Sequence, residues 1–372
     1  MSATTSTIRY WEYLGDYRAH REEYLRLCDE VLSSGRLVLG PRLAAFEARL
    51  AARCGVRHAV GVASGTDALL LALRALGIGR GDEVVTVANT AVPTVAAIRM
   101  AGATPAFVDV EEDTFLMDPT LLERAVTPRT RCILPVHLLG QMVEMGPVLE
   151  CARRHRLSVV EDCAQACGAS DQGHPAGSLG DAGAFSFYPT KVLGAFGDGG
   201  AVITSRPELH ERLRGLRAYG MRDGQVAAEE GYNSRLDELQ AALLDRRLER
   251  LEEAVAARRR IAQIYDEGLS GVADLQLPVV GPGRTHQRYV YTVRTSRRDA
   301  LARALAERGI ETKVNYPTPI HLMPAYRGLG YPAGSLPVTE RLAGTILSLP
   351  MYPELPEAAA AEVVSAVRRG LR

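Results

Sequence analysis

Short apolar runs alternate with helical patterns between residues 58 and 203, and this alternation constrains the fold more than any other feature. The first runs are HAVGVA, DEVVTVA, TPAFVDV, RCILPVHL and LSVVED, and helical patterns lie between them, for example at 66–76 and 148–155. Strands that are apolar on both faces are typical of a mostly parallel sheet covered by helices. GAFSFYP and GGAVITS add two strands that flank a loop. We therefore predict an α/β fold.

The pattern changes after a charged helical stretch at 234–266, where strands such as YVYTVRT and a helix at 298–308 follow. A chain of 372 residues can hold more than one domain. We predict a large domain at 1–247, which includes the N-terminal segment, and a smaller α+β domain at 248–372. The acid–base alternation in RRLERLEEAVAARRRIAQIY is typical of a solvated helix face, and we interpret it as a helix that connects the domains.

The charge balance disfavours polyanionic ligands. Lys plus Arg number 44, and Asp plus Glu also number 44. Because no net positive charge attracts nucleic acid or an anionic membrane, a small molecule is the expected ligand. The start, MSATTSTIRYWEYLG, has no signal-peptide pattern, and no apolar stretch is long enough to span a bilayer. We therefore expect a cytoplasmic protein.

Two patterns that could indicate a bound metal or a dinucleotide do not meet the requirements of such a site. Cys163 and Cys167 have a spacing that suits a metal or redox pair, but no second Cys pair or nearby His cluster completes a site, so we expect no bound metal. GIGRGDE carries glycines at Gly77, Gly79 and Gly81, but it follows a helix and precedes a strand. Because a dinucleotide-binding motif has the reverse order, we interpret this segment as a turn.

Lys191 ends the segment SFYPTK, after a strand and a proline turn and before the glycine-rich VLGAFGDGG. Glycines let the neighbouring backbone come close to a ligand, and a lysine on such a loop can reach into a cleft. Its amine could then act as a nucleophile. A lysine after a strand is more often solvated, so this segment alone leaves both interpretations open.

Asp162 ends the apolar strand in VVEDCAQACGA, and Ala164 and Gln165 follow it. Open α/β sheets bind ligands beyond the carboxyl ends of their strands, where this carboxylate would point. It could oppose a cationic ring nitrogen there, while Gln165 donates to a ring hydroxyl and the small Ala164 allows close contact. The alternative is that Asp162 only caps a helix.

VASGTDALLLAL has the pattern of a strand, a turn and a helix. Backbone N–H groups of Gly65 and Thr66 at the helix start would form an anion site, and Ser186 could add a hydroxyl. A simple helix start, with Ser64 or Thr66 as its cap, explains the same segment. Together, a lysine, an acid and an anion site are what chemistry on pyridoxal 5'-phosphate (PLP) requires.

The motifs SGTDAL, EDCAQACGA, SFYPTK, GDGGA and GYNSRLDELQAA have the order and spacing found in sugar aminotransferases of the DegT/StrS type, which are fold type I PLP enzymes. The resemblance extends from SGRLVLGP near the start to IHLMPAY and LSLPMYPEL near the end. It implies a large domain with a mostly parallel seven-stranded sheet covered by helices, and a smaller α+β C-terminal domain.

The resemblance also implies roles at the cofactor. Lys191 would form the Schiff base with PLP, Asp162 would pair with the pyridine nitrogen, and Gln165 would face the ring hydroxyl. The residues that would bind the phosphate are Gly65, Thr66 and Ser186.

Other implied residues lie further along the chain. Asn233 would contact the phosphate of a neighbouring subunit, which implies a homodimer with shared active sites. Tyr316 and His321 would line the sugar pocket. Many family members stack an aromatic residue on the PLP ring, but this chain has Ala91 at the matching place in ANTAVPTVAA, so we assign no stacking residue.

The implied reaction moves an amino group from an amino acid, usually L-glutamate, by way of pyridoxamine phosphate. The acceptor would be a nucleoside-diphosphate sugar, namely a dTDP-linked 4-keto-6-deoxysugar or a related keto-sugar, in deoxyaminosugar or antibiotic-sugar biosynthesis. We favour C4 because a 4-keto sugar is the direct dehydratase product, and amination at C3 is also open. The rivals are a PLP-dependent sugar dehydratase, whose members tend to have His at the lysine position, and a catalytically inactive PLP or nucleotide-sugar sensory protein.

Overall fold

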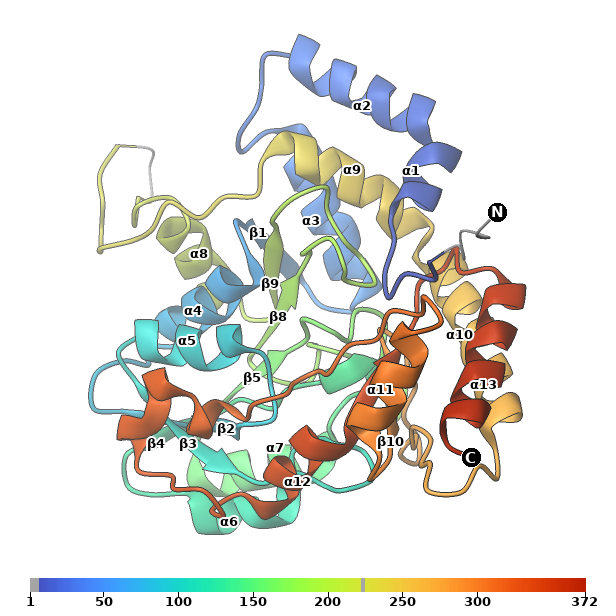
Figure 1. Cartoon of the computed structure of the whole chain (residues 1–372). Coiled ribbons are helices and arrows are strands. Elements are labelled where there is room, and N and C mark those ends of the chain that lie inside the picture. Colours follow the sequence, from blue (N-terminus) through green and yellow to red (C-terminus); the bar gives the residue numbers. More distant parts are fainter. Residues whose placement is uncertain (1–6, 222–224) are drawn as a thin grey trace.

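The computed structural model describes residues 7–221 and 225–372. Residues 1–6 of MSATTSTIRYWEYLG, part of the segment that predicts no signal peptide, lie outside the described residues. A seven-stranded sheet lies at the centre of the described chain (Figure 1). Its strands are β1 (His58–Val62), β2 (Glu83–Val87), β3 (Thr104–Val108), β4 (Thr130–Ile133), β5 (Ser158–Asp162), β8 (Ala182–Ser186) and β9 (Gly200–Thr204).

The strand order across the sheet is β1-β9-β8-β5-β4-β2-β3. The five strands from β8 to β3 are mutually parallel, whereas β9 runs antiparallel to both of its neighbours, β8 and β1. The prediction of a mostly parallel seven-stranded sheet is therefore confirmed. Since antiparallel neighbours need no crossover helix, a loop alone joins β8 to β9, and this loop carries Lys191.

Helices cover the sheet because its strands are apolar on both faces. All five residues of β2 are buried, for example. Among the covering helices, α4 packs on β8 and β9, α7 packs on β4 and β5, and α3 packs on β1. The helices of this region are α3 (Pro41–Arg53), α4 (Gly65–Ala75), α5 (Val92–Met100), α6 (Leu122–Ala125), α7 (Met145–His155), α8 (Pro207–Leu216) and α9 (Glu238–Glu249).

A second, smaller core lies toward the C-terminus. Helices α10 (Leu251–Leu269) and α13 (Glu357–Gly370) pack side by side (gold and red in Figure 1). They share buried apolar residues with the antiparallel strands β10 (Tyr291–Arg294) and β11 (Ile346–Leu349) and with α11 (Arg298–Ala306). Helix α12 (Pro337–Thr345) leads into β11. The domain boundary at residue 248 stays a prediction.

The charged segment at 246–265 is not the single connecting helix that its pattern predicts. Helix α9 ends at Glu249 and α10 begins at Leu251, because Arg250 between them has φ −96° and ψ 7°, outside the helical range. The two N-terminal helices are α1 (Leu14–Ala19) and α2 (Arg21–Ser33), and α2 packs on α9. Across residues 7–221 and 225–372, no helix has both the length and the apolar character needed to cross a bilayer.

Candidate active site

A cavity of about 220 Å³ lies where the carboxyl ends of β5 and β8 meet the N-terminus of α4. This is the edge at which open α/β sheets bind ligands. The structure places six of the predicted residues around this one cavity, although they come from three separate segments. They are Gly65, Thr66, Asp162, Gln165, Ser186 and Lys191.

Lys191 lies on the loop after β8, and its side chain is half-buried. Its Nζ lies 4.8 Å from the centroid of the Tyr289 ring. The solvated alternative is therefore disfavoured, because the amine borders the cavity and packs over an aromatic face. The whole chain contains only one other lysine, Lys313, which is exposed.

Asp162 is the last residue of β5 and is only 3 % exposed. Its Oδ2 accepts a hydrogen bond of 2.8 Å from Thr94 Oγ1, and its Oδ1 accepts one of 3.1 Å from the backbone N–H of Ala164. Burial raises the pKa of Asp162, whereas these hydrogen bonds and the charge of Lys191 act to lower it. A cation held against the carboxylate would also act to lower this pKa and so favour the ionised form. The site therefore suits a protonated ring nitrogen.

The helix-cap alternative for Asp162 is wrong, because β5 leads into a turn and then β6 (Ser170–Asp171) instead of a helix. Thr94 was missed by sequence reasoning. The residue lies in ANTAVPTVAA, at the start of α5, and only the fold brings it to Asp162. Ala91 of the same segment lines the cavity, and the residue that stacks on the PLP ring stays unassigned.

Helix α4 begins at the cavity. Ser64 is its N-cap and accepts a hydrogen bond of 3.1 Å from the backbone N–H of Asp67. The next N–H groups, those of Gly65 and Thr66, belong to the helix start that has no intrahelical acceptor. A Cβ on Gly65 would lie 2.4 Å from the Cβ of Ser186, so only glycine allows this close approach. The helix start and the anion site are thus compatible interpretations of one segment.

Gln165 connects the cavity to the C-terminal part of the chain. Its Oε1 accepts a hydrogen bond of 2.8 Å from the backbone N–H of Leu139, and its Nε2 donates one of 2.9 Å to the hydroxyl of Tyr316. Burial raises the pKa of Tyr316, so its hydroxyl keeps its proton at neutral pH. Tyr316 therefore lies next to a residue of the cavity wall.

Sequence reasoning also missed His137, which lines the cavity and is fully buried. Its Nδ1 accepts a hydrogen bond of 3.1 Å from the N–H of Val143, so Nε2 carries the proton and donates to Glu161 Oε2 at 2.8 Å. Glu161 also accepts three backbone N–H groups, from Gly177, Leu179 and Gly180. The signal for His137 was its place just after an apolar strand, in RCILPVHL.

Three predicted residues do not line the cavity: His321, Asn233 and Tyr316, which contacts it only through Gln165. His321 is 1 % exposed, and its Nε2 lies 3.0 Å from Glu340 Oε1. Asn233 is exposed on the segment before α9. Their proposed contacts with the sugar and with a neighbouring subunit therefore stay predictions.

The similarity to known proteins extends over nearly the full length of the chain. Residues 18–368 match the sequence profile of the DegT/DnrJ/EryC1/StrS aminotransferase family. This chain belongs to that family. The enzyme is accordingly a PLP-dependent sugar aminotransferase, as the motifs predict.

Among curated proteins, this aminotransferase is 52% identical over 367 residues to a dTDP-3-amino-3,4,6-trideoxy-alpha-D-glucose transaminase of Micromonospora megalomicea, covering 97% of this chain and 98% of the relative. It is 48% identical to the protein of the same name in Streptomyces venezuelae, with 98% and 97% covered. It is also 46% identical to the erythromycin biosynthesis sensory transduction protein EryC1 of Saccharopolyspora erythraea, with 95% and 97% covered.

Solved structures of similar proteins share the fold. The structure of S. venezuelae DesV in complex with a ketimine intermediate has a TM-score of 0.96 at 48% identity, covering 98% of this chain and 99% of that one. The structure of NtdA from Bacillus subtilis with bound cofactor PMP has a TM-score of 0.87 at 31% identity, covering 94% and 82%. The fold type I prediction is confirmed.

The cavity of this aminotransferase fits PLP by its donor set and its shape. A buried carboxylate lies at one end, backbone N–H groups of α4 lie at another, and the Lys191 amine borders the space between them. The approach of Gly65 to Ser186 leaves no room there for a larger residue. The cavity therefore offers separate partners for a phosphate, a protonated ring nitrogen and an aldehyde, which is the set that PLP needs.

Gly65→Ala should weaken PLP binding by roughly 10- to 100-fold, because overpacking a close contact costs about 1–3 kcal/mol. The matched control is Gly146→Ala, also within a helix, where a Cβ would meet no heavy atom within 4 Å. Dissociation constants come from titrating the apoenzyme with PLP and following absorbance. Equal affinity of the Gly65→Ala protein and the wild type would contradict the phosphate site.

Proposed function

We propose that this aminotransferase moves an amino group from L-glutamate to C3 of a dTDP-linked keto-deoxysugar. The observation that carries the proposal is the 52% identity, over nearly the full length of both chains, to a transaminase whose name specifies a 3-amino-3,4,6-trideoxy-glucose. Transamination places nitrogen where a ketone stood, so such a product derives from a 3-keto sugar. This assignment replaces the preference for C4, which rested only on the ease of supplying a 4-keto sugar.

Each of these residues of the cavity would have its own role in the reaction. Bound PLP supplies an aldehyde that holds the substrate nitrogen and an electron-poor ring that stabilises negative charge on the neighbouring carbon. Lys191 would hold the cofactor at rest and, once displaced, would move a proton between the substrate carbon and the cofactor carbon. Asp162 would keep the ring nitrogen protonated, oriented by Thr94. Gly65, Thr66 and Ser186 would anchor the phosphate.

The carbon of the sugar that is aminated can be identified by running the reaction in reverse. Purified enzyme would receive 2-oxoglutarate with either dTDP-3-amino-3,4,6-trideoxyglucose or a dTDP-4-amino-4,6-dideoxysugar, and L-glutamate would be measured. We expect glutamate to form with the 3-amino sugar at a kcat/KM at least roughly 100-fold higher, since a misplaced amine loses its alignment with the cofactor. Preference for the 4-amino sugar would contradict the proposal.

A sensory role is the second candidate, because one relative carries that description in its name. It predicts bound PLP without conversion of L-glutamate to 2-oxoglutarate. A single-turnover reaction of the holoenzyme with glutamate alone separates the two candidates. The placement of Lys191 beside Asp162 at one cavity supports turnover. The same lysine disfavours the sugar dehydratase, whose members tend to have His there.

We also propose that the enzyme is a cytoplasmic homodimer with shared active sites. A group of large apolar side chains on α2 and the loop that follows is left exposed, as is Tyr188 at the cavity. A second copy would cover these residues. They are Leu25 (45% exposed), Leu32 (61%), Leu37 (51%), Val38 (47%), Leu39 (45%) and Tyr188 (53%).

Mixing two inactive proteins tests the shared site. Lys191→Ala and Asn233→Ala dimers are mixed in equal amounts, allowed to exchange subunits, and assayed. If Asn233 serves the neighbouring site, half of the dimers are mixed and each has one complete site, so activity should return to about one quarter of the wild-type value. If Asn233 serves its own subunit, every site keeps one defect and no activity returns, despite exchange shown by mass spectrometry.

A further inference from the structure

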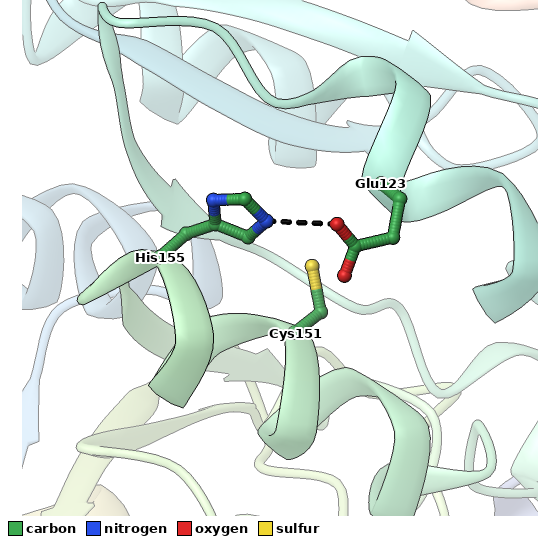
Figure 2. A group of neighbouring side chains, drawn as sticks. All are labelled: Glu123, Cys151 and His155. Carbon is green, nitrogen blue, oxygen red and sulfur yellow. Dashed lines mark hydrogen bonds and ion pairs between the residues drawn. The ribbon is translucent and has the colours of Figure 1, made fainter.

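Three side chains of different chemistry converge at the contact between α6 and α7 (Figure 2). Cys151 and His155 lie four residues apart on α7 and so share one helix face, and Glu123 comes from α6. The thiol, a ring nitrogen and a carboxylate oxygen all lie within 4.8 Å of one another. His155 Nε2 and Glu123 Oε2 are joined directly, at 2.8 Å.

This donor set is one that zinc prefers. Zinc binds thiolate, imidazole and carboxylate groups at about 2.0–2.3 Å in a tetrahedral arrangement. Tetrahedral ligands at those lengths lie roughly 3.3–3.7 Å apart, so small rotations of side chains already in contact would form three corners of the site. The direct His155–Glu123 hydrogen bond would be replaced by two bonds to the metal.

Neighbouring residues hold the carboxylate in place for such a role. Arg154 Nη1 donates to Glu123 Oε1 at 2.6 Å, which leaves Oε2 for the metal, and Arg154 Nη2 donates to Glu150 at 3.0 Å. A ligand oriented by a hydrogen bond from outside the coordination shell is the usual pattern in metal sites. Glu123 and His155 are exposed, so water can reach a fourth position.

The cluster lies far from the PLP cavity. His155 precedes the first residue of β5, whereas Asp162 is the last residue of that strand. Five strand residues at about 3.3 Å each place the two sites roughly 16 Å apart, at opposite ends of β5. A metal bound here would join α6 to α7 without touching the reacting groups.

We propose that Glu123, Cys151 and His155 bind a zinc ion, with water as the fourth ligand. Cys151 supplies the thiolate, and its thiol proton is released to solvent when the metal binds. The site has no part in amino transfer, so it stands independently of the proposed substrate.

Cobalt(II) titration of tag-free, chelator-treated holoenzyme tests the proposal. Tetrahedral Co²⁺ with a thiolate ligand absorbs visible light at longer wavelengths than PLP, so its bands report the site directly. We expect these bands to appear at one equivalent and to disappear when Zn²⁺ is added. Cys151→Ser should abolish the bands, and His155→Asn should weaken cobalt binding at least tenfold.

Cys28→Ser is the matched control, because Cys28 is a partly exposed thiol that belongs to neither metal-ligand cluster found among the described residues. It should keep the cobalt bands. All three variants should keep the PLP absorption and amino transfer of the wild type, which shows that they fold. Absence of the bands in the wild type, or their persistence in Cys151→Ser, would overturn the proposal.

Discussion

Lys191→Ala should lower the rate of amino transfer by more than about a thousandfold, because one amine is expected to hold the cofactor and to carry both proton transfers. Its Nζ is at the PLP cavity, 4.8 Å from the Tyr289 ring centroid. The measurement is the single-turnover conversion of L-glutamate to 2-oxoglutarate. The variant should fold normally, because the side chain makes no hydrogen bond that the fold requires within the described residues.

The chain offers a matched control for this result. Lys313 is its only other lysine, is exposed, and lies over the ring of Tyr10, 6.0 Å from its centroid. Lys313→Ala should keep wild-type turnover. A Lys191→Ala protein that converts glutamate at a rate near that of Lys313→Ala would refute the assignment of the catalytic amine.

Asp162→Asn should lower kcat by roughly 10²- to 10³-fold, the range seen when one preorganised electrostatic contact is lost. The amide has nearly the same shape but cannot hold a protonated ring nitrogen as an ion pair, so the ring loses its power to withdraw electrons. The buried position and the hydrogen bond from Thr94 keep solvent from replacing the lost charge. Rates come from the same single-turnover reaction.

Asp181→Asn is a suitable comparison for Asp162. Asp181 lies just before β8, at the opposite edge of the sheet, and its Oδ2 accepts a hydrogen bond of 2.9 Å from the N–H of Val159. This variant should lose stability rather than rate, and its kcat should stay near that of the wild type. If the two variants differ in stability alone, the Asp162 carboxylate is structural.

Much of the fold was predictable because it is set by local periodicity. Apolar runs such as that of β2 are buried on both faces, and this pattern indicates a helix-covered parallel sheet. The direction of β9 was not predictable, because GGAVITS has the same pattern in either orientation. The break at Arg250 was also hidden, since charged helical periodicity continues across it.

The same distinction applies to the candidate site, where some residues could be predicted from the sequence and others could not. Lys191, Asp162 and Gly65 each belong to a local motif with a chemical reason, so the sequence points to them. Thr94 acts on Asp162 across 68 positions of the chain, and only the packing of α5 on the sheet brings them together. Contacts of this kind carry no local signal. The Glu123 cluster was missed for the same reason, because its third ligand lies on another helix.

Reduction of the resting holoenzyme with borohydride, followed by peptide mapping, tests the central claim most directly. The reagent fixes PLP permanently to the amine that holds it, and only two lysines and the terminal amine can compete. We predict that the pyridoxyl group is found on the peptide that contains Lys191. Its presence on the Lys313 peptide, or on no lysine at all, would contradict the account.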